Sequence, residues 1–237
     1  MKVALLRIGV DSGTGGIQGP LFQAGSFEYI PIPDDFSVDR RTYGNTVERC
    51  GRPLVAYFPP RRQAKMFYQS IHFDPEFSTN TYGDPTSPKA GLRNLERGDM
   101  LVFYCGLEGW GFESKPALYL MGYFEVLAAG RAQDFSETQL RRYFGENFHV
   151  RHESVYRQQA AKLVLVKGTS NSRILTNAVL MSTMGKDRAG QPLKLLSPEM
   201  QKIFGNFDGK LSFQRSPTRW IDSDFVHRAA AFMRALD

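Results

Sequence analysis

The sequence predicts one α+β domain over residues 1–237, rich in β-strands, with short flanking helices and a C-terminal helix. Hydrophobic residues make up 42% of the 237 positions, which is enough to bury a substantial core. Short apolar runs bounded by glycine and proline predict the strands, and amphipathic segments over 136–145, 197–205 and 222–237 predict the helices. The sequence has no internal repeat and no clean linker, which favours one domain over two.

The N-terminal part is predicted to hold short strands separated by irregular segments. Residues 2–10 form a buried strand that ends at Asp11 and Gly13. Residues 26–33 and 53–60 form further short strands, each limited by proline, which has no backbone N–H to give to a sheet. Residues 70–91 are crowded with Asp, Asn, Gly and Pro, which indicates a long irregular loop. Such loops often carry function.

The middle of the chain predicts a β-hairpin followed by a helix. Two apolar runs, 100–104 and 117–126, flank a glycine-rich loop around Trp110. Ser136 with Gln139 three residues later is the pattern of a capping box, so a short helix is expected to begin there and to end at Gly145. Residues 161–168 predict the next buried strand.

Two more helices are predicted near the C-terminus. The segment 197–205 has a proline in its first turn, where the missing N–H costs nothing. The last helix repeats apolar residues at helical spacing, and these define one buried face. That predicted face consists of Phe225, Ala229, Phe232 and Leu236.

Composition indicates the compartment and the class of partner. The formal charge is +6 and the pI about 9.3, a moderate bias toward polyanions. The stretch 141–173 holds seven basic and two acidic residues, although a solvated charged face is an equally good interpretation. The two cysteines, Cys50 and Cys105, lie far apart, which fits a reducing compartment. The opening segment is too short for a signal peptide and no apolar run reaches ~18 residues, so we expect a cytoplasmic protein with no membrane partner.

The predicted hairpin resembles a known β-barrel. The phrases "RGDMLVFY" and "LYLMGYFEV" are similar to the central hairpin of PUA-like barrels, the group that includes the ASCH, EVE and YTH domains. The resemblance implies a mixed β-barrel with its core around residues 97–130 and 160–185. Because these phrases are short and generic β-sheet chemistry, they indicate a fold and no activity.

A second resemblance spans much more of the chain. The segments "RIGVDSGTGGIQGPLF", "HFDPEF", "ERGDMLVFYCGL", "ENFHVR", "LVLVKGTSNSRILTNAVLMS" and "FQRSPTRWI" together resemble the prokaryotic and phage family called nucleotide modification associated domain 3. The resemblance implies a link to base-modified nucleic acid. It supplies no catalytic residues, so the site must be argued from the residues themselves.

The glycine-rich segment after the first strand is not a standard nucleotide cradle. It lacks the lysine of a Walker loop, and Pro20 prevents the helix that a dinucleotide fingerprint opens. Its backbone amides can still form a small anion nest. The alternative is a glycine-rich connection in which Asp11 caps the local backbone. The residues of this predicted anion loop are Asp11, Ser12, Gly13, Gly15 and Gly16.

The segment "ENFHVRHE" places Asn147, His149 and Arg151 at alternate positions. In an extended segment these side chains point to one side and can hold a phosphate and a base edge. Exposed polar residues on an edge strand are the alternative. A zinc site that joins His149 and His152 to His72 and Asp74 is not demanded by the spacing, so neither a metal nor a cofactor is predicted.

Other candidate contacts to nucleic acid come from loops. Cations and short polar side chains at strand ends suit phosphate oxygens, and aromatic side chains stack on bases. An Asx turn in the segment 167–173 and a lid made by the indole are the structural alternatives. The candidates are Lys167, Asn171, Ser172 and Arg173, then Arg215 and Arg219, with Tyr104 or Trp110 for stacking.

These residues lead to three hypotheses of function. The first is a nucleic-acid-binding protein, with DNA as the expected partner, that recognises an extruded modified base. The second is an enzyme acting on a nucleotide or modified base, with His72, Asp74 and His149 as acid, base or metal ligands. Asp-Pro is also a common turn starter. The third hypothesis is an interaction module that does not bind nucleic acid. The sequence does not decide between DNA and RNA, and it does not give the oligomeric state.

Overall fold

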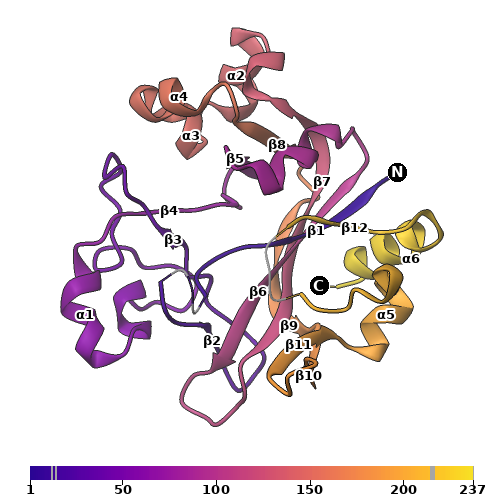
Figure 1. The fold of residues 1–237 in the computed structure, drawn as a ribbon. Helices are drawn as coiled ribbons and strands as arrows, with labels where there is room; N and C mark the ends of the chain where they lie inside the picture. Colours follow the sequence, from indigo (N-terminus) through magenta and orange to yellow (C-terminus); the bar gives the residue numbers. More distant parts are fainter. Residues whose placement is uncertain (12, 14, 214–216, 237) are drawn as a thin grey trace.

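The computed structural model describes residues 1–237 except 12, 14, 214–216 and 237. In the described residues, eight strands form a mixed sheet with the order β12-β1-β6-β7-β8-β5, while β2 also pairs with β6 and β9 with β7 (Figure 1). The strands of this sheet are β1 (Val3–Arg7), β2 (Gly19–Leu21), β5 (Thr81–Asp84), β6 (Met100–Gly109), β7 (Ala117–Arg131), β8 (Val164–Gly168), β9 (Arg173–Leu180) and β12 (Arg219–Trp220).

The predicted α+β class is confirmed, but the barrel is not. The pairs β1–β6 and β2–β6 are parallel and the pairs β6–β7 and β7–β8 are antiparallel, which makes the sheet mixed. The path of paired strands ends at β12 on one side and at β5 on the other, so the strands of the described ranges do not close on themselves. The hairpin that suggested a PUA-like barrel is present as β6 and β7, but here it is the centre of an open sheet.

Each face of the sheet packs into its own hydrophobic cluster, because side chains alternate along a strand. Leu6 and Phe103 point into one cluster, whereas Leu5 and Tyr104 point into the other. The first face is covered by the segment before β4 (Ile71–His72), which includes α1 (Pro60–Phe67). The second face is covered by α5 (Pro198–Phe204) and α6 (Ser223–Arg234) (Figure 1).

The remaining elements are short. A third cluster lies under α2 (Glu137–Phe144) at the far end of β7 and β8. The chain then forms α3 (Phe148–Arg151) and α4 (Glu153–Gln159) before it enters β8. The other short elements are β3 (Ile32–Pro33), β10 (Ser182–Lys186), β11 (Pro192–Leu196), η1 (Leu54–Tyr57), η2 (Ser87–Asn94), η3 (Ala132–Asp134) and η4 (Phe207–Gly209).

The helix starts predicted from capping residues are confirmed. The Ser136 hydroxyl accepts from the Gln139 backbone N–H at 3.3 Å, and the Gln139 side chain accepts from the Ser136 N–H at 2.9 Å. Ser197 caps α5, and Pro198 occupies its first turn. In α6 the buried face is rotated from the predicted one, because Val226 and Met233 are buried while Phe225 and Phe232 are only partly so.

Three predictions for local structure were wrong. Residues 53–60 form η1 and the start of α1 instead of a strand, because Pro60 takes the first helical position that suits proline. Only Ile32–Pro33 of the segment 26–33 is a named strand. The expected irregular loop 70–91 contains β4, β5 and the start of η2. No helix in the described part of the chain is both long and apolar enough to cross a bilayer.

Replacement of Phe103 by alanine tests the first hydrophobic cluster. The Phe103 ring is fully buried and meets Phe124 edge-on at 4.7 Å between centroids. Phe103→Ala should lower the free energy of unfolding by about 3–5 kcal/mol, measured by urea denaturation. Tyr68→Ala, at a side chain that is 81% exposed, should change it by about 0.5 kcal/mol or less. Equal effects of the two variants would contradict this core.

Candidate active site

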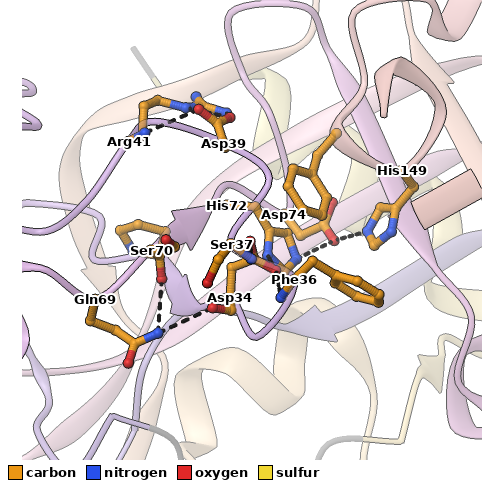
Figure 2. A network of polar contacts seen from close by, with 12 residues as sticks. Asp34, Phe36, Ser37, Asp39, Arg41, Gln69, Ser70, His72, Asp74 and His149 are labelled. Atoms are coloured by element: carbon orange, nitrogen blue, oxygen red, sulfur yellow. Dashed lines mark hydrogen bonds and ion pairs between the residues drawn. The ribbon is translucent and has the colours of Figure 1, made fainter. Parts of the chain in front are cut away.

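The carboxylate of Asp74 lies at the centre of a buried polar cluster (Figure 2). Its Oδ2 atom is 2.7 Å from Nε2 of His149 and 3.4 Å from Nε2 of His72. Its Oδ1 atom accepts a hydrogen bond from the backbone N–H of Gly83 at 3.2 Å. The two oxygens therefore make different contacts: Oδ1 is bonded to strand β5, and Oδ2 faces the two imidazole rings.

His149 is positioned by the short helix α3. Asn147 is the N-cap, and its side-chain oxygen accepts from the His149 backbone N–H at 3.1 Å. The Asn147 amide donates to the Thr81 hydroxyl at 3.1 Å, which joins α3 to β5. On the far side of the ring, Nδ1 of His149 lies 2.6 Å from Oε1 of Gln159 in α4.

The predicted extended triplet of Asn147, His149 and Arg151 is therefore wrong. The segment is helical because Asn147 caps it, and a capping side chain is occupied by the backbone. Arg151 points elsewhere, since its guanidinium donates to Asp39 at 2.8 Å. Only His149 of the three faces Asp74.

His72 completes the cluster from β4. Its ring stacks on Phe148 with 4.3 Å between centroids and 13° between planes. Its Nδ1 atom lies 3.8 Å from Oδ1 of Asp34. Asp34 is itself held by the backbone N–H groups of Phe36 and Ser37, at 3.0 and 3.2 Å (Figure 2).

Gly83 allows β5 to approach this cluster closely. A Cβ atom at this position would lie 2.6 Å from Cδ2 of His149 and 3.0 Å from the side-chain oxygen of Asn147. Real Cβ atoms essentially never come that close to another heavy atom. The absence of a side chain at Gly83 is thus what permits its N–H to reach Asp74 beside His149.

The cluster holds opposite charges together away from water. Burial disfavours a charged His149, but Asp74, Gln159 and Asp84 together outweigh that effect and raise the pKa of His149, with Asp74 contributing most among them. Burial likewise acts to raise the pKa of Asp74, but His149 and His72 together lower it. Glu76 lies nearby and accepts from the Phe148 N–H at 2.6 Å, and burial raises its pKa to about 7.

Asp74 also lines a cavity of about 300 Å³, defined here as the Asp74 cavity. Two cations contribute to its wall, Arg7 at the end of β1 and Lys89 in η2, and Lys89 is only 6% exposed. Arg7 pairs with Asp11 at 3.2 Å. Asp11 lines the cavity as well, and the other polar groups of the wall are Tyr82, Asp84 and Thr86.

A second cavity, of about 220 Å³, lies next to the first. Arg93, Arg131 and Lys162 line it, and we call it the basic cavity. In the described residues no carboxylate contributes to its wall. Thr86 lines both cavities, so they are neighbours.

From the sequence we selected the segment 70–91 but neither cation of the Asp74 cavity. The polar loop 70–91 was expected to be functional, yet Lys89 within it was not selected. The position of Arg7 could have been noticed, because it is the one charged residue of an apolar strand and stands at the end of that strand, next to a loop. Arg93 and Arg131 gave no signal, since only the fold brings them to Lys162.

In the predicted anion loop, two of the described amides bond to Asp11. The Asp11 side chain accepts from the Gly13 N–H at 2.7 Å, and its carbonyl accepts from the Gly16 N–H at 2.9 Å. Asp11 therefore acts as the local cap that was the alternative interpretation. Gly15 adopts a positive φ of 83°, and Ser12 lies outside the described residues.

The two stacking candidates lie on different faces. Tyr104 is fully buried beside Phe213 in the second cluster, which leaves no ring face for a base. Trp110 meets Tyr57 edge-on at 5.1 Å and lines a separate cavity of about 590 Å³ together with Gly16. The tip of the β6–β7 hairpin lies at the opposite end of the sheet from α3 (Figure 1), so Trp110 and His149 do not share a hollow.

The remaining predicted contacts are spread over the fold. Asn171 donates to Glu125 at 3.0 Å, and the hydroxyl of the buried Ser172 accepts from the Glu125 N–H at 3.1 Å. Arg173 lies over the ring of Tyr123. Lys167 donates to the Thr79 carbonyl, Arg219 lies over the Phe213 ring, and Arg215 is outside the described residues.

Of the four residues considered for zinc, three come together. One nitrogen or oxygen from each of His72, Asp74 and His149 lies within 4.8 Å of the others. His152 is not in this group, and its Nε2 accepts from the Arg151 Nε at 3.3 Å.

Comparison with known families agrees with the resemblance seen in the sequence. The match to the nucleotide modification associated domain 3 family covers residues 2–235, nearly the whole chain. No curated protein and no solved structure matches the chain. The family match and the cluster around Asp74 lie on the same polypeptide, and the chain belongs to the nucleotide modification associated domain 3 family.

Proposed function

We propose that this protein binds one nucleotide of a nucleic-acid strand in the Asp74 cavity and acts on it there. The observation that carries the proposal is the position of Asp74, whose carboxylate both faces two imidazole rings and lines a cavity with two cations. A cavity of about 300 Å³ is at the lower end of the range for small-molecule sites, which suits a single nucleotide unit. The family's link to nucleotide modification supports the same class of substrate.

The cations of the Asp74 cavity suit a phosphate group. Burial lowers the pKa of Lys89, which is the expected response of an ammonium group withdrawn from water. Asp84 acts in the opposite direction on Lys89, and an anion beside Lys89 would offset the cost of burial further with a charge-assisted hydrogen bond. Arg7 already pairs with Asp11, so we assign the phosphate contact to Lys89. Asp84 accepts from the Tyr82 hydroxyl at 3.0 Å and from the Thr86 N–H at 2.6 Å, so this carboxylate shapes the wall.

The basic cavity favours a nucleic-acid strand over a free nucleotide as the ligand. Three cations converge there, and Thr86 separates them from the Asp74 cavity. Consecutive nucleotides in a strand carry one phosphate each, so a strand with one unit beside Asp74 places a neighbouring phosphate near these cations. Contacts of this kind position a strand without reading its sequence.

Action on a nucleotide is better supported than the recognition of a modified base. The recognition hypothesis needed Trp110, His149 and Asn171 around one hollow, and they lie in three different places. The enzyme hypothesis needed His72, Asp74 and His149 together, and they are. The geometry therefore favours the second hypothesis from the sequence.

Replacement of Lys89 tests the phosphate contact. Lys89→Gln should weaken the binding of deoxynucleoside monophosphates about tenfold or more, because a hydrogen bond to a charged group contributes about 1.5–3 kcal/mol. Isothermal titration calorimetry measures this effect, with the corresponding nucleosides as phosphate-free ligands. The control is Lys186→Gln at an exposed lysine of β10. Equal affinity of both variants for the monophosphates would refute the assigned cavity.

A double variant tests whether a nucleic-acid strand contacts the basic cavity. Arg131→Gln with Lys162→Gln should weaken the binding of a single-stranded oligonucleotide and leave the binding of a monophosphate unchanged. The slope of log K against log salt should also become shallower, by about 0.7 for each phosphate that the variant no longer neutralises. Arg141→Gln, at an exposed arginine of α2 that pairs with Glu137, is the matched control. Should the control weaken the affinity as much as the double variant does, the strand runs over α2 instead.

A further inference from the structure

We propose that His72, Asp74 and His149 form a binding site for one divalent first-row transition metal ion. The donors are Nε2 of each imidazole and Oδ2 of the carboxylate, and the structure brings all three within 4.8 Å of one another. They come from β4, from the residue two positions after it, and from α3. The site is thus built by tertiary structure, with both rings presenting the same nitrogen.

The atoms behind the ligands carry the argument further. In metal sites a ligating histidine almost always donates its other ring N–H to an oxygen, which fixes the tautomer. His149 has Oε1 of Gln159 at 2.6 Å from Nδ1, and His72 has Oδ1 of Asp34 at 3.8 Å from Nδ1. The Gln159 contact keeps a proton on Nδ1 of His149, so its Nε2 is the nitrogen that can bind a metal. The Asp34 oxygen is beyond hydrogen-bond distance from His72, so of the two rings His149 alone has its second nitrogen bonded in this way.

The carboxylate is oriented in the same way. Oδ1 of Asp74 accepts from the Gly83 N–H, so Oδ2 is turned toward the two rings. Gly83 and Asn147 fix β5 and α3 against each other, and Phe148 stacks on the His72 ring. Each of the three donors is therefore also held by a hydrogen bond or a packing contact to a residue outside the set, in addition to the 2.7 Å contact between His149 and Asp74.

The donor set selects a class of metal. Two imidazoles and one carboxylate suit Zn²⁺, Fe²⁺ and Mn²⁺, whereas Ca²⁺ and Mg²⁺ prefer oxygen ligands. Three protein ligands leave coordination positions open for water or substrate, as in catalytic sites. Asp74 also lines the Asp74 cavity, so a metal held by it lies next to the space assigned to the nucleotide.

The alternative is a permanent ion pair between Asp74 and His149 without a metal. It explains the 2.7 Å contact of these two residues, but it gives no role to His72, which faces the same oxygen at 3.4 Å and has no hydrogen-bond partner at its buried Nδ1. The two arrangements make different predictions for metal binding. The metal site itself does not depend on the proposed function, because metal binding is measured without nucleotide. Only the placement of the metal next to the bound nucleotide rests on the proposed function.

Metal titration of the full chain tests the site. Protein stripped with a chelator should bind Zn²⁺ with a stoichiometry of one by isothermal titration calorimetry, and Co²⁺ should give the visible absorption of a site with nitrogen and oxygen ligands. His72→Ala and His149→Ala should each lower the affinity at least tenfold. His152→Ala and His227→Ala should leave it unchanged, because His152 is outside the cluster and His227 is exposed on α6.

A gentler variant guards against loss of folding. Gln159→Met removes the oxygen that lies 2.6 Å from Nδ1 of His149 and keeps an unbranched side chain of similar length. It should weaken metal binding about 10–100-fold while the urea midpoint of the metal-free protein stays close to that of the wild type. The inference is overturned if the wild type shows no saturable binding, or if binding survives in both His72→Ala and His149→Ala. Metal binding without nucleotide binding would refute the proposed function and leave the metal site intact.

Discussion

The site depends on one carboxylate being held from two directions at once. The Gly83 N–H fixes Oδ1 of Asp74 from the sheet, while His149 meets Oδ2 from α3. Taking a carboxylate out of water is costly unless it is both paired and hydrogen-bonded, and Asp74 has both kinds of partner. Removal of either partner would leave a buried charge poorly compensated. The arrangement of β5 against α3 is therefore tied to the state of this one side chain.

The sheet supplies the rigidity that this arrangement requires. β5 is the last strand of the path and pairs with β8, which in turn pairs with the long strand β7. An edge strand is free on one side, and here the backbone of that side bonds to the segment around Asp74, through Glu76 with Thr81 and through the Gly83 N–H with Asp74. α3 meets the Thr81 side chain of the same strand. The cluster thus lies at a sheet edge, between the segment that bonds to that edge and the helix α3. This position leaves Asp74 close to the surface cavity without exposing the imidazole rings.

Elements that depend on neighbouring residues could be predicted from the sequence. Contacts between residues far apart in the chain could not. Ser136 and Gln139 marked α2 because a capping box is complete within four residues. The partners of Asp74 could be proposed from residue types, but His149 is 75 positions away and its approach depends on the missing side chain at Gly83. The helix at 148–151 was missed because one turn has no periodicity to detect. Arg93 and Arg131 had no local feature that separates them from other surface arginines.

The distribution of cations shows why charge density along the chain is a poor guide to a polyanion site. Within the basic stretch 141–173, Arg141 and Arg157 pair with glutamates one helical turn away, and Arg151 pairs with Asp39. A phosphate that approached these arginines would have to displace a carboxylate already in contact. Lys162 belongs to the same stretch, but the fold turns it toward two arginines from elsewhere in the chain. Like charges brought together repel unless an anion joins them. The proposed phosphate contact therefore rests on this convergence and not on the length of the basic run.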